Sequence, residues 1–255
     1  MTMETVLPEP QIKQDSVYFQ IMARKRSWSP VAVDRGPIAK GAEASIFKAL
    51  ALRCLEIPVK EFLEQGLEKE LPKTPGVVEI LRSNQKDEDR HDLAFKYIVE
   101  AHGVDEKAER EAQVILKAWR DDPSHPIQKA AIAERSVFFV LLPFYRFNGD
   151  YGMKTTSADI SRDEQTHVTS HHMVCKELGI APSKSLNKLR RATVAWVMDS
   201  LEKTVEENRW QNKDFWIAQS DSLYSKGKAE GLIDTRRSRM PAFFEVSNSN
   251  LPSYS

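Results

Sequence analysis

The stretch Leu81-Arg-Ser-Asn-Gln-Lys-Asp-Glu-Asp-Arg-His-Asp-Leu-Ala-Phe95 decides the fold class, because its apolar residues recur at helical spacing around a Glu-x-x-His sequence. Three residues span about 300° of helix rotation, so Glu88 and His91 point the same way. The apolar residues on that face are Leu81, Phe95, Ile98 and Val99. A glutamate and a histidine are therefore predicted to project from a helix into a core.

A second stretch repeats this arrangement on a different predicted helix. Glu164-Gln-Thr-His167 has the same spacing, and apolar residues share or flank its face: Ile160, Val168, Val174 and Cys175. One Glu-x-x-His sequence alone is more often a solvated surface pair than a metal site. Two of them on core faces favour a shared buried site.

Two further glutamates lie on apolar faces. Glu134 is followed at positions i+3, i+4 and i+7 by Val137, Phe138 and Leu141, and Glu43 at the same spacings by Ile46, Phe47 and Leu50. An alternative for Glu43 is open, because an acid near the start of a helix can simply favour the helix dipole.

Buried glutamates need compensation, because an ionised carboxylate buried without a partner costs several kcal/mol or more. Two divalent metal ions would supply it, and carboxylate oxygens combined with imidazole nitrogens suit iron or manganese. One Glu from each of two helices plus Glu-x-x-His from two others is the ligand pattern of ferritin-like di-metal bundles. The predicted ligands are Glu43, Glu88, His91, Glu134, Glu164 and His167.

The rest of the chain also has helical periodicity, and no strand-like alternation competes with it. Helices are expected over residues 39–55, 58–68, 77–101, 105–121, 127–147, 157–178, 184–208 and 212–229, with Gly103 and Gly179 as C-terminal stops. The sequence predicts one all-α, ferritin-like bundle of seven or eight helices over residues 39–235. An irregular arm would precede it at 1–38, and a flexible tail would follow at 236–255.

Composition excludes several classes of function. The 255 residues contain 37 Lys plus Arg and 37 Asp plus Glu, and zero net charge argues against binding nucleic acid by bulk electrostatics. The longest strongly apolar run, residues 136–144, is half of what a membrane span needs. The start of the chain is unlike a signal peptide, and Cys54 and Cys175 fall in apolar helical patterns, so a cytoplasmic protein is expected.

The segment Ser161-Arg-Asp-Glu-Gln-Thr-His-Val-Thr-Ser-His-His-Met173 closely resembles the Arg-Asp-Glu-x-x-His segment of class I ribonucleotide reductase small (β, radical-generating) subunits. Ala133-Glu134-Arg-Ser-Val-Phe-Phe resembles the third-helix metal glutamate of that family. Arg237-Ser-Arg-Met-Pro-Ala-Phe-Phe-Glu245 resembles the segment before the family's flexible tail. The resemblance spans residues 39–245 and implies reduction of ribonucleotides to deoxyribonucleotides together with a large subunit.

The resemblance implies a role for each predicted ligand. Glu43 with His91 would hold one metal, Glu134 with His167 the other, and Glu88 with Glu164 would bridge them. Asp163 resembles the aspartate that bonds the first metal histidine in the family; without the resemblance, a surface acid is equally good. His171 and His172 are interpreted as a satisfied core histidine and a surface one, and the tryptophans at 119, 196, 210 and 216 as packing residues.

Phe95 is an informative departure from the family pattern. It occupies the position of the radical tyrosine, seven residues after the Glu of the first pair. Phenylalanine there resembles the manganese–iron subgroup, in which the metal pair activated by O₂ stores the oxidising equivalent itself. Glu rather than Asp as first ligand is also similar to that subgroup, so a Mn/Fe centre is favoured over Fe/Fe.

The resemblance also implies partners: a homodimer formed through the long helices, and a large (α) subunit docked by the C-terminal tail. Tyr254 would relay the radical between subunits and Trp28 would start the relay near the metals, although by itself Tyr254 is an ordinary tail residue. Two alternatives compete: a ferritin-like di-metal oxidase or oxygenase acting on its own small substrate, and metal storage. An open pocket reaching the metals would favour the oxygenase.

Overall fold

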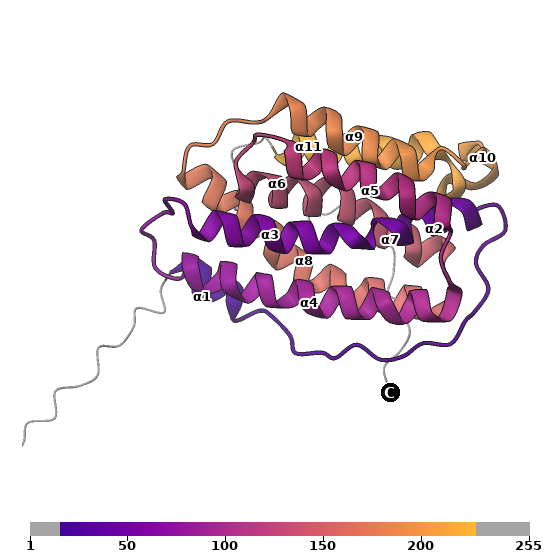
Figure 1. Cartoon of the computed structure of the whole chain (residues 1–255), viewed down its shortest axis with the longest axis horizontal. Helices are drawn as coiled ribbons and strands as arrows, with labels where there is room; N and C mark the ends of the chain where they lie inside the picture. The colour runs from indigo at the N-terminus through magenta and orange to yellow at the C-terminus, as the bar shows by residue number, and fades with distance from the viewer. Residues whose placement is uncertain (1–15, 228–255) are drawn as a thin grey trace, which may run out of the picture.

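The computed structural model describes residues 16–227, and every regular element in this part of the chain is a helix, without a strand, which confirms the predicted all-α class (Figure 1). The helices are α1 Val17–Met22, α2 Glu43–Ala51, α3 Glu56–Leu67, α4 Val77–His102, α5 Glu106–Asp121, α6 Pro126–Ala133, α7 Phe139–Asn148, α8 Tyr151–Glu177, α9 Lys184–Met198, α10 Val205–Asn208 and α11 Lys213–Gly227. Three short turns join them: the 3-10 turns η1 Leu52–Leu55 and η3 Arg209–Gln211, and the π-helical turn η2 Glu134–Phe138.

Helices α3, α4 and α8, together with α6 and α7, which follow one another along the chain, form a closed ring around the centre of the molecule. α3 packs on α4, α4 on α8, α8 on α6 and α7, and α6 returns to α3. α9 and α11 pack together beside this ring, and α5 lies against α2 and α9 (Figure 1). The arrangement is compatible with a ferritin-like bundle, in which side chains from four facing helices can meet at the core.

The N-terminal arm is not irregular throughout, contrary to the prediction for residues 1–38. Ser16 caps α1 by accepting a hydrogen bond from the Tyr18 backbone N–H, and Tyr18 and Ile21 are buried. Six residues are too short to show helical periodicity, so the sequence pattern missed this helix. Residues 25–39 then run without regular structure along α4 toward α2 (Figure 1).

Helix ends show where local signals sufficed and where they did not. Gly103 and Gly179 follow the ends of α4 and α8 with φ of 82° and 65°, as predicted, because glycine enters the left-handed region without strain. α8 begins at Tyr151, earlier than expected, since Asp150 accepts from the Met153 N–H at 2.9 Å and caps it there. The helix predicted over 184–208 ends at Met198, and a capping box at Thr204 starts α10.

No helix among residues 16–227 combines the length and the apolar character needed to cross a membrane. The predicted tail at 236–255, including Tyr254, lies outside the described residues, as does the beginning of the arm.

Candidate metal centre

Acidic and histidine side chains from four helical columns meet inside the ring. One group that could hold a metal ion comprises Glu56, Glu88, His91 and Glu164, and a second comprises Glu88, Glu134 and His167. The ligand atoms in each group lie within 4.8 Å of one another, and all six side chains are fully buried. The structure thus brings together five of the six residues predicted from the sequence.

Glu43 is the residue that the structure does not place in the cluster, and Glu56 lies there instead. Glu43 is the exposed first residue of α2, and its carboxylate accepts a hydrogen bond from the Gly41 N–H at 2.6 Å. The prediction of Glu43 as a ligand is therefore wrong. Glu56 has Val59 and Leu63 on its own helix face, but it fell into the gap between two predicted helices, 39–55 and 58–68.

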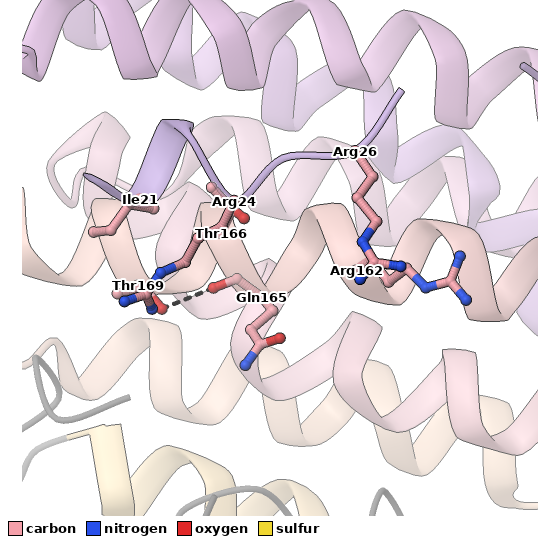
Figure 2. Close-up of a pocket in the computed structure, with 7 residues that line it drawn as sticks. All are labelled: Ile21, Arg24, Arg26, Arg162, Gln165, Thr166 and Thr169. Atoms are coloured by element: carbon pink, nitrogen blue, oxygen red, sulfur yellow. Dashed lines mark hydrogen bonds between the residues drawn. The ribbon is translucent and has the colours of Figure 1, made fainter. Parts of the chain in front are cut away.

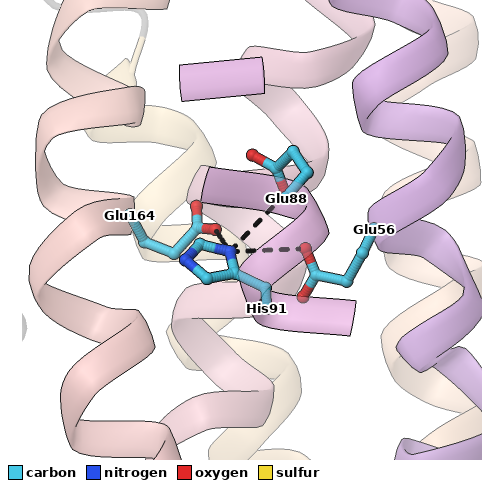
Figure 3. A group of neighbouring side chains, drawn as sticks. All are labelled: Glu56, Glu88, His91 and Glu164. Carbon is cyan, nitrogen blue, oxygen red and sulfur yellow. Dashed lines mark ion pairs between the residues drawn. The ribbon is translucent and has the colours of Figure 1, made fainter. Parts of the chain in front are cut away.

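Glu88 and Glu164 both face the two histidines, which suits residues that bridge two ions. His91 Nδ1 lies 3.4 Å from Glu164 Oε1, 3.6 Å from Glu88 Oε2 and 3.7 Å from Glu56 Oε2 (Figure 3). His167 Nδ1 lies 3.1 Å from Glu88 Oε1, 3.6 Å from Glu134 Oε1 and 3.7 Å from Glu164 Oε1. Both Nδ1 atoms therefore point into one shared space lined with carboxylates.

The polar atoms that line this space lack hydrogen-bond partners. Among the described residues, no hydrogen bond reaches either carboxylate oxygen of Glu56, Glu88 or Glu164, Oε1 of Glu134, or Nδ1 of His91 and His167. Leaving so many buried polar atoms unpaired is strongly unfavourable in a protein core. A divalent cation coordinated by oxygen and imidazole ligands would satisfy them, so the residues fit a metal site.

Burial and mutual repulsion set the protonation of the cluster. Burial raises the pKa of Glu164 to about 8 and also raises the pKa of Glu56. Burial would raise the pKa of Glu88 too, but the imidazoles of His167 and His91 lower it below its ordinary value. Without metal the cluster therefore retains protons, which a bound cation would displace.

The two histidines are held by aspartates in a crossed arrangement. His91 of α4 donates from Nε2 to Asp163 of α8 at 3.3 Å, and His167 of α8 donates from Nε2 to Asp87 of α4 at 3.0 Å. These bonds direct each Nδ1 toward the cluster, as expected for metal-ligating histidines. The structure places Asp163 where the family resemblance put it. The sequence reasoning missed Asp87, although both pairs are preceded by aspartate, in the pattern Asp-Glu-x-x-His.

Residues of the N-terminal arm bind the two aspartates. Trp28 donates from Nε1 to Asp163 at 2.7 Å, and its ring stacks on His91 with centroids 6.2 Å apart. Lys25 forms an ion pair with Asp87. Arg90 donates to both aspartates and lies over the Trp28 ring, 5.0 Å from its centroid. Trp28, Asp163 and His91 thus form a continuous series of contacts from the partly exposed arm to the cluster.

Glu134 is positioned by an unusual backbone and by a second histidine. It is the first residue of the π-helical turn η2, which interrupts the helix predicted as continuous over 127–147. Such turns often occur at functional sites. His171 donates to Glu134 Oε2 at 2.6 Å and is a satisfied core histidine, whereas His172, interpreted as a surface residue, is also buried.

Phe95 is a buried core residue of α4, one helical turn after His91. Its side chain is 4% exposed and packs on Tyr145, with ring centroids 5.8 Å apart. The Tyr145 hydroxyl is buried without a hydrogen-bond partner among the described residues, and burial raises its pKa. The position predicted to correspond to the radical tyrosine is therefore a buried phenylalanine ring that packs on a second aromatic ring.

No known protein family matches the chain, and no match is found among curated proteins or solved structures. The function must therefore be argued from the chemistry of the site.

Proposed function

We propose that the chain is the small, radical-generating subunit of a class I ribonucleoside-diphosphate reductase, an oxidoreductase component that acts on ribonucleotides bound by a separate large subunit. The observation that carries the proposal is the connection from Trp28 through Asp163 to His91 of the buried cluster. An indole beside the arm surface, joined by hydrogen bonds to a metal-site histidine, suits electron transfer between the cluster and a partner.

In this proposal Glu56 and His91 would hold one ion and Glu134 and His167 the other, and Glu88 and Glu164, which face both histidines, would serve both ions. With a metal pair bound and O₂ as the oxidant, the site would supply a strong one-electron oxidant. Mn/Fe is favoured over Fe/Fe because Phe95 has no phenolic hydroxyl and cannot form a stable tyrosyl radical.

The chain's own residues orient and insulate this site. Asp163 accepts from Trp28, His91 and Arg90, and despite its burial these partners hold its pKa below the ordinary value. It therefore remains a carboxylate, fixes the His91 ring, and places negative charge beside the indole N–H. That charge favours removal of an electron from Trp28.

Full burial of the cluster favours this function over a di-metal oxidase or oxygenase with its own small substrate. Such an enzyme needs a pocket that reaches the metal ligands, yet all six ligand side chains are inaccessible to solvent. The recess between the arm and α8 is lined by none of them. A sealed site suits an oxidant that is stored and then reduced by electron transfer from the partner, without contact with the substrate.

The proposal also includes partners. The chain would act in the cytoplasm as a homodimer and dock on the large subunit through its C-terminal tail, with Tyr254 as relay. Tyr254→Phe should preserve metal loading and dimerisation but nearly eliminate nucleotide reduction, because phenylalanine is too hard to oxidise. Sedimentation would test the dimer, and full turnover by the variant would exclude the relay.

The decisive experiment loads the protein with Mn(II) and Fe(II), exposes it to O₂ and assays nucleotide reduction with the large subunit from the same source. We expect turnover, an oxidised heterodinuclear centre in electron paramagnetic resonance spectra, and no stable tyrosyl radical. Protein loaded with iron alone is the matched control and should be less active. A fully metal-loaded protein that binds the large subunit but supports no reduction would contradict the proposal.

A further inference from the structure

A recess of about 370 Å³ lies between the arm and α8 (Figure 2). Its polar lining comprises Arg24, Arg26, Arg162, Gln165, Thr166 and Thr169. Two of the arginines come from the segment after α1 and the third from α8, so the basic side chains approach the recess from both walls (Figure 2). We call this feature the arginine recess.

The arginine recess carries local positive charge on a chain whose formal net charge is zero. Arg162 is paired with Asp159 at 2.9 Å, but Arg24 and Arg26 form no ion pair with any residue from 16 to 227. All three arginines are exposed. Guanidinium groups bind carboxylates through paired, planar hydrogen bonds, so an anionic partner would relieve their mutual repulsion.

The arginine recess adjoins the contacts that connect Trp28 to the cluster. Arg26 precedes Trp28 by two residues, and Arg162 immediately precedes Asp163. A body bound in the recess would therefore touch the same arm segment and the same stretch of α8 that hold the Trp28–Asp163 hydrogen bond.

We propose that the arginine recess is a docking surface for an acidic face of a protein partner. Resting on the proposed function, that partner is the reductase large subunit. Small-molecule sites are mostly apolar and enclosed, whereas this recess is lined mainly by polar side chains and its arginines are exposed. Arginine is enriched at protein interfaces, and complementary charge accelerates association and fixes orientation. Docking here would hold the partner beside Trp28.

The test compares two full-length variants with the same change in net charge at two different places on the surface. Arg24→Glu/Arg26→Glu alters the recess, and Lys107→Glu/Arg110→Glu makes the same change in charge on exposed positions of α5. Association with the immobilised large subunit is measured at low and high salt. We expect the recess variant to associate about tenfold more slowly at low salt, the control within about twofold of the original protein, and the difference to shrink as salt rises.

Metal content and the helical circular dichroism spectrum establish that both variants are folded. If the double glutamate variant does not fold, Arg24→Gln/Arg26→Gln replaces it, with a smaller expected loss of association rate. Equal association rates for recess and control variants would overturn the recess proposal while leaving the proposed function intact. Failure of the original protein to bind the large subunit would overturn both. If the recess variant loses binding of inorganic phosphate in calorimetry but associates normally, the recess is a small-anion site and the proposal fails.

Discussion

The two halves of the candidate metal centre begin from the same sequence pattern and end in different surroundings. The His91 half-site consists of Glu56, His91 and Asp163, and the His167 half-site of Glu134, His167 and Asp87. In each, a histidine is oriented by the aspartate that precedes the other pair's glutamate. Up to these aspartates the two halves are nearly interchangeable.

Beyond the aspartates the halves diverge. Asp163 accepts a hydrogen bond from Trp28, whose indole can be oxidised by one electron. Asp87 forms an ion pair with Lys25, whose ammonium group cannot be oxidised in this way. On the other side, Glu134 is held by His171, while both carboxylate oxygens of Glu56 lack a hydrogen-bond partner among the described residues. Similar ligand geometry thus supports similar metal binding, but among the described residues only the His91 half-site is joined by a hydrogen bond to an indole, the route that the proposed function requires.

The largest expected effect concerns the glutamate that completes the His91 half-site. Glu56→Ala should lower the metal content from two ions to about one per chain, because it removes a ligand from that half only. Glu43→Ala is the matched control and should retain two, since Glu43 is exposed at the start of α2. Elemental analysis after loading with Mn(II) and Fe(II) decides between them. Loss of an ion in the Glu43 variant instead would reverse the assignment.

The next effect separates the electron route from metal binding. Trp28→Phe should leave both ions bound and lower nucleotide reduction at least about 100-fold, because phenylalanine is much harder to oxidise and removes the bond to Asp163. Trp196→Phe is a suitable control, since Trp196 also donates to a carboxylate, Glu111 at 2.7 Å, but contacts no metal-site histidine. Turnover assays with the large subunit measure both. Comparable losses in the two variants would remove the distinction between the half-sites.

A smaller pair of effects tests the crossed aspartates. Asp163→Asn and Asp87→Asn should each weaken metal affinity about 10- to 100-fold, the usual cost of losing a carboxylate that orients a ligating histidine. Competition with a chelator measures the affinity. At saturating metal, only Asp163→Asn should also slow turnover, because only Asp163 contacts Trp28. Slow turnover in the saturated Asp87 variant would indicate a second route.

Much of this centre could be predicted because helical periodicity fixes which way a side chain points. Glu88, His91, Glu134, Glu164 and His167 were found in this way, and all are buried together. Glu56 was not predicted as a ligand because it is the first residue of its helix, and periodicity defines helix boundaries least well. The hydrogen bond of Asp87 with His167 is a contact between helices, so helical spacing alone does not give it, and only the repeated Asp-Glu-x-x-His pattern could have indicated it.

The smallest effect concerns the edge of the His167 half-site, where His171 and His172 are neighbours on α8 with different roles. His171 bonds to Glu134, whereas His172 donates from Nδ1 to the Val168 carbonyl, and its buried Nε2 has no hydrogen-bond partner within residues 16–227. A proton on Nε2 would have no acceptor, and burial accordingly lowers the pKa of His172 from 6.5 to about 3. This histidine is therefore neutral in the folded protein.

The consequence is a dependence of stability on pH that metal ligation does not explain. Above pH 6.5 His172 is neutral in both states, but below it the unfolded chain binds a proton that the folded chain refuses, until about pH 3. As the pH is lowered from 6.5 toward 3, the free energy of unfolding should therefore fall by about 1.4 kcal/mol per pH unit because of His172. His172→Gln retains a donor for Val168 and has no titrating group, so denaturant unfolding of metal-free protein between pH 7 and 5 should show a shallower slope for the variant. The contributions of His91 and His167, whose pKa values are raised in the folded protein, are common to both proteins and cancel in the difference. Parallel slopes would mean that His172 binds its proton over the same pH range in the folded and the unfolded protein. This edge of the half-site would then be open to water.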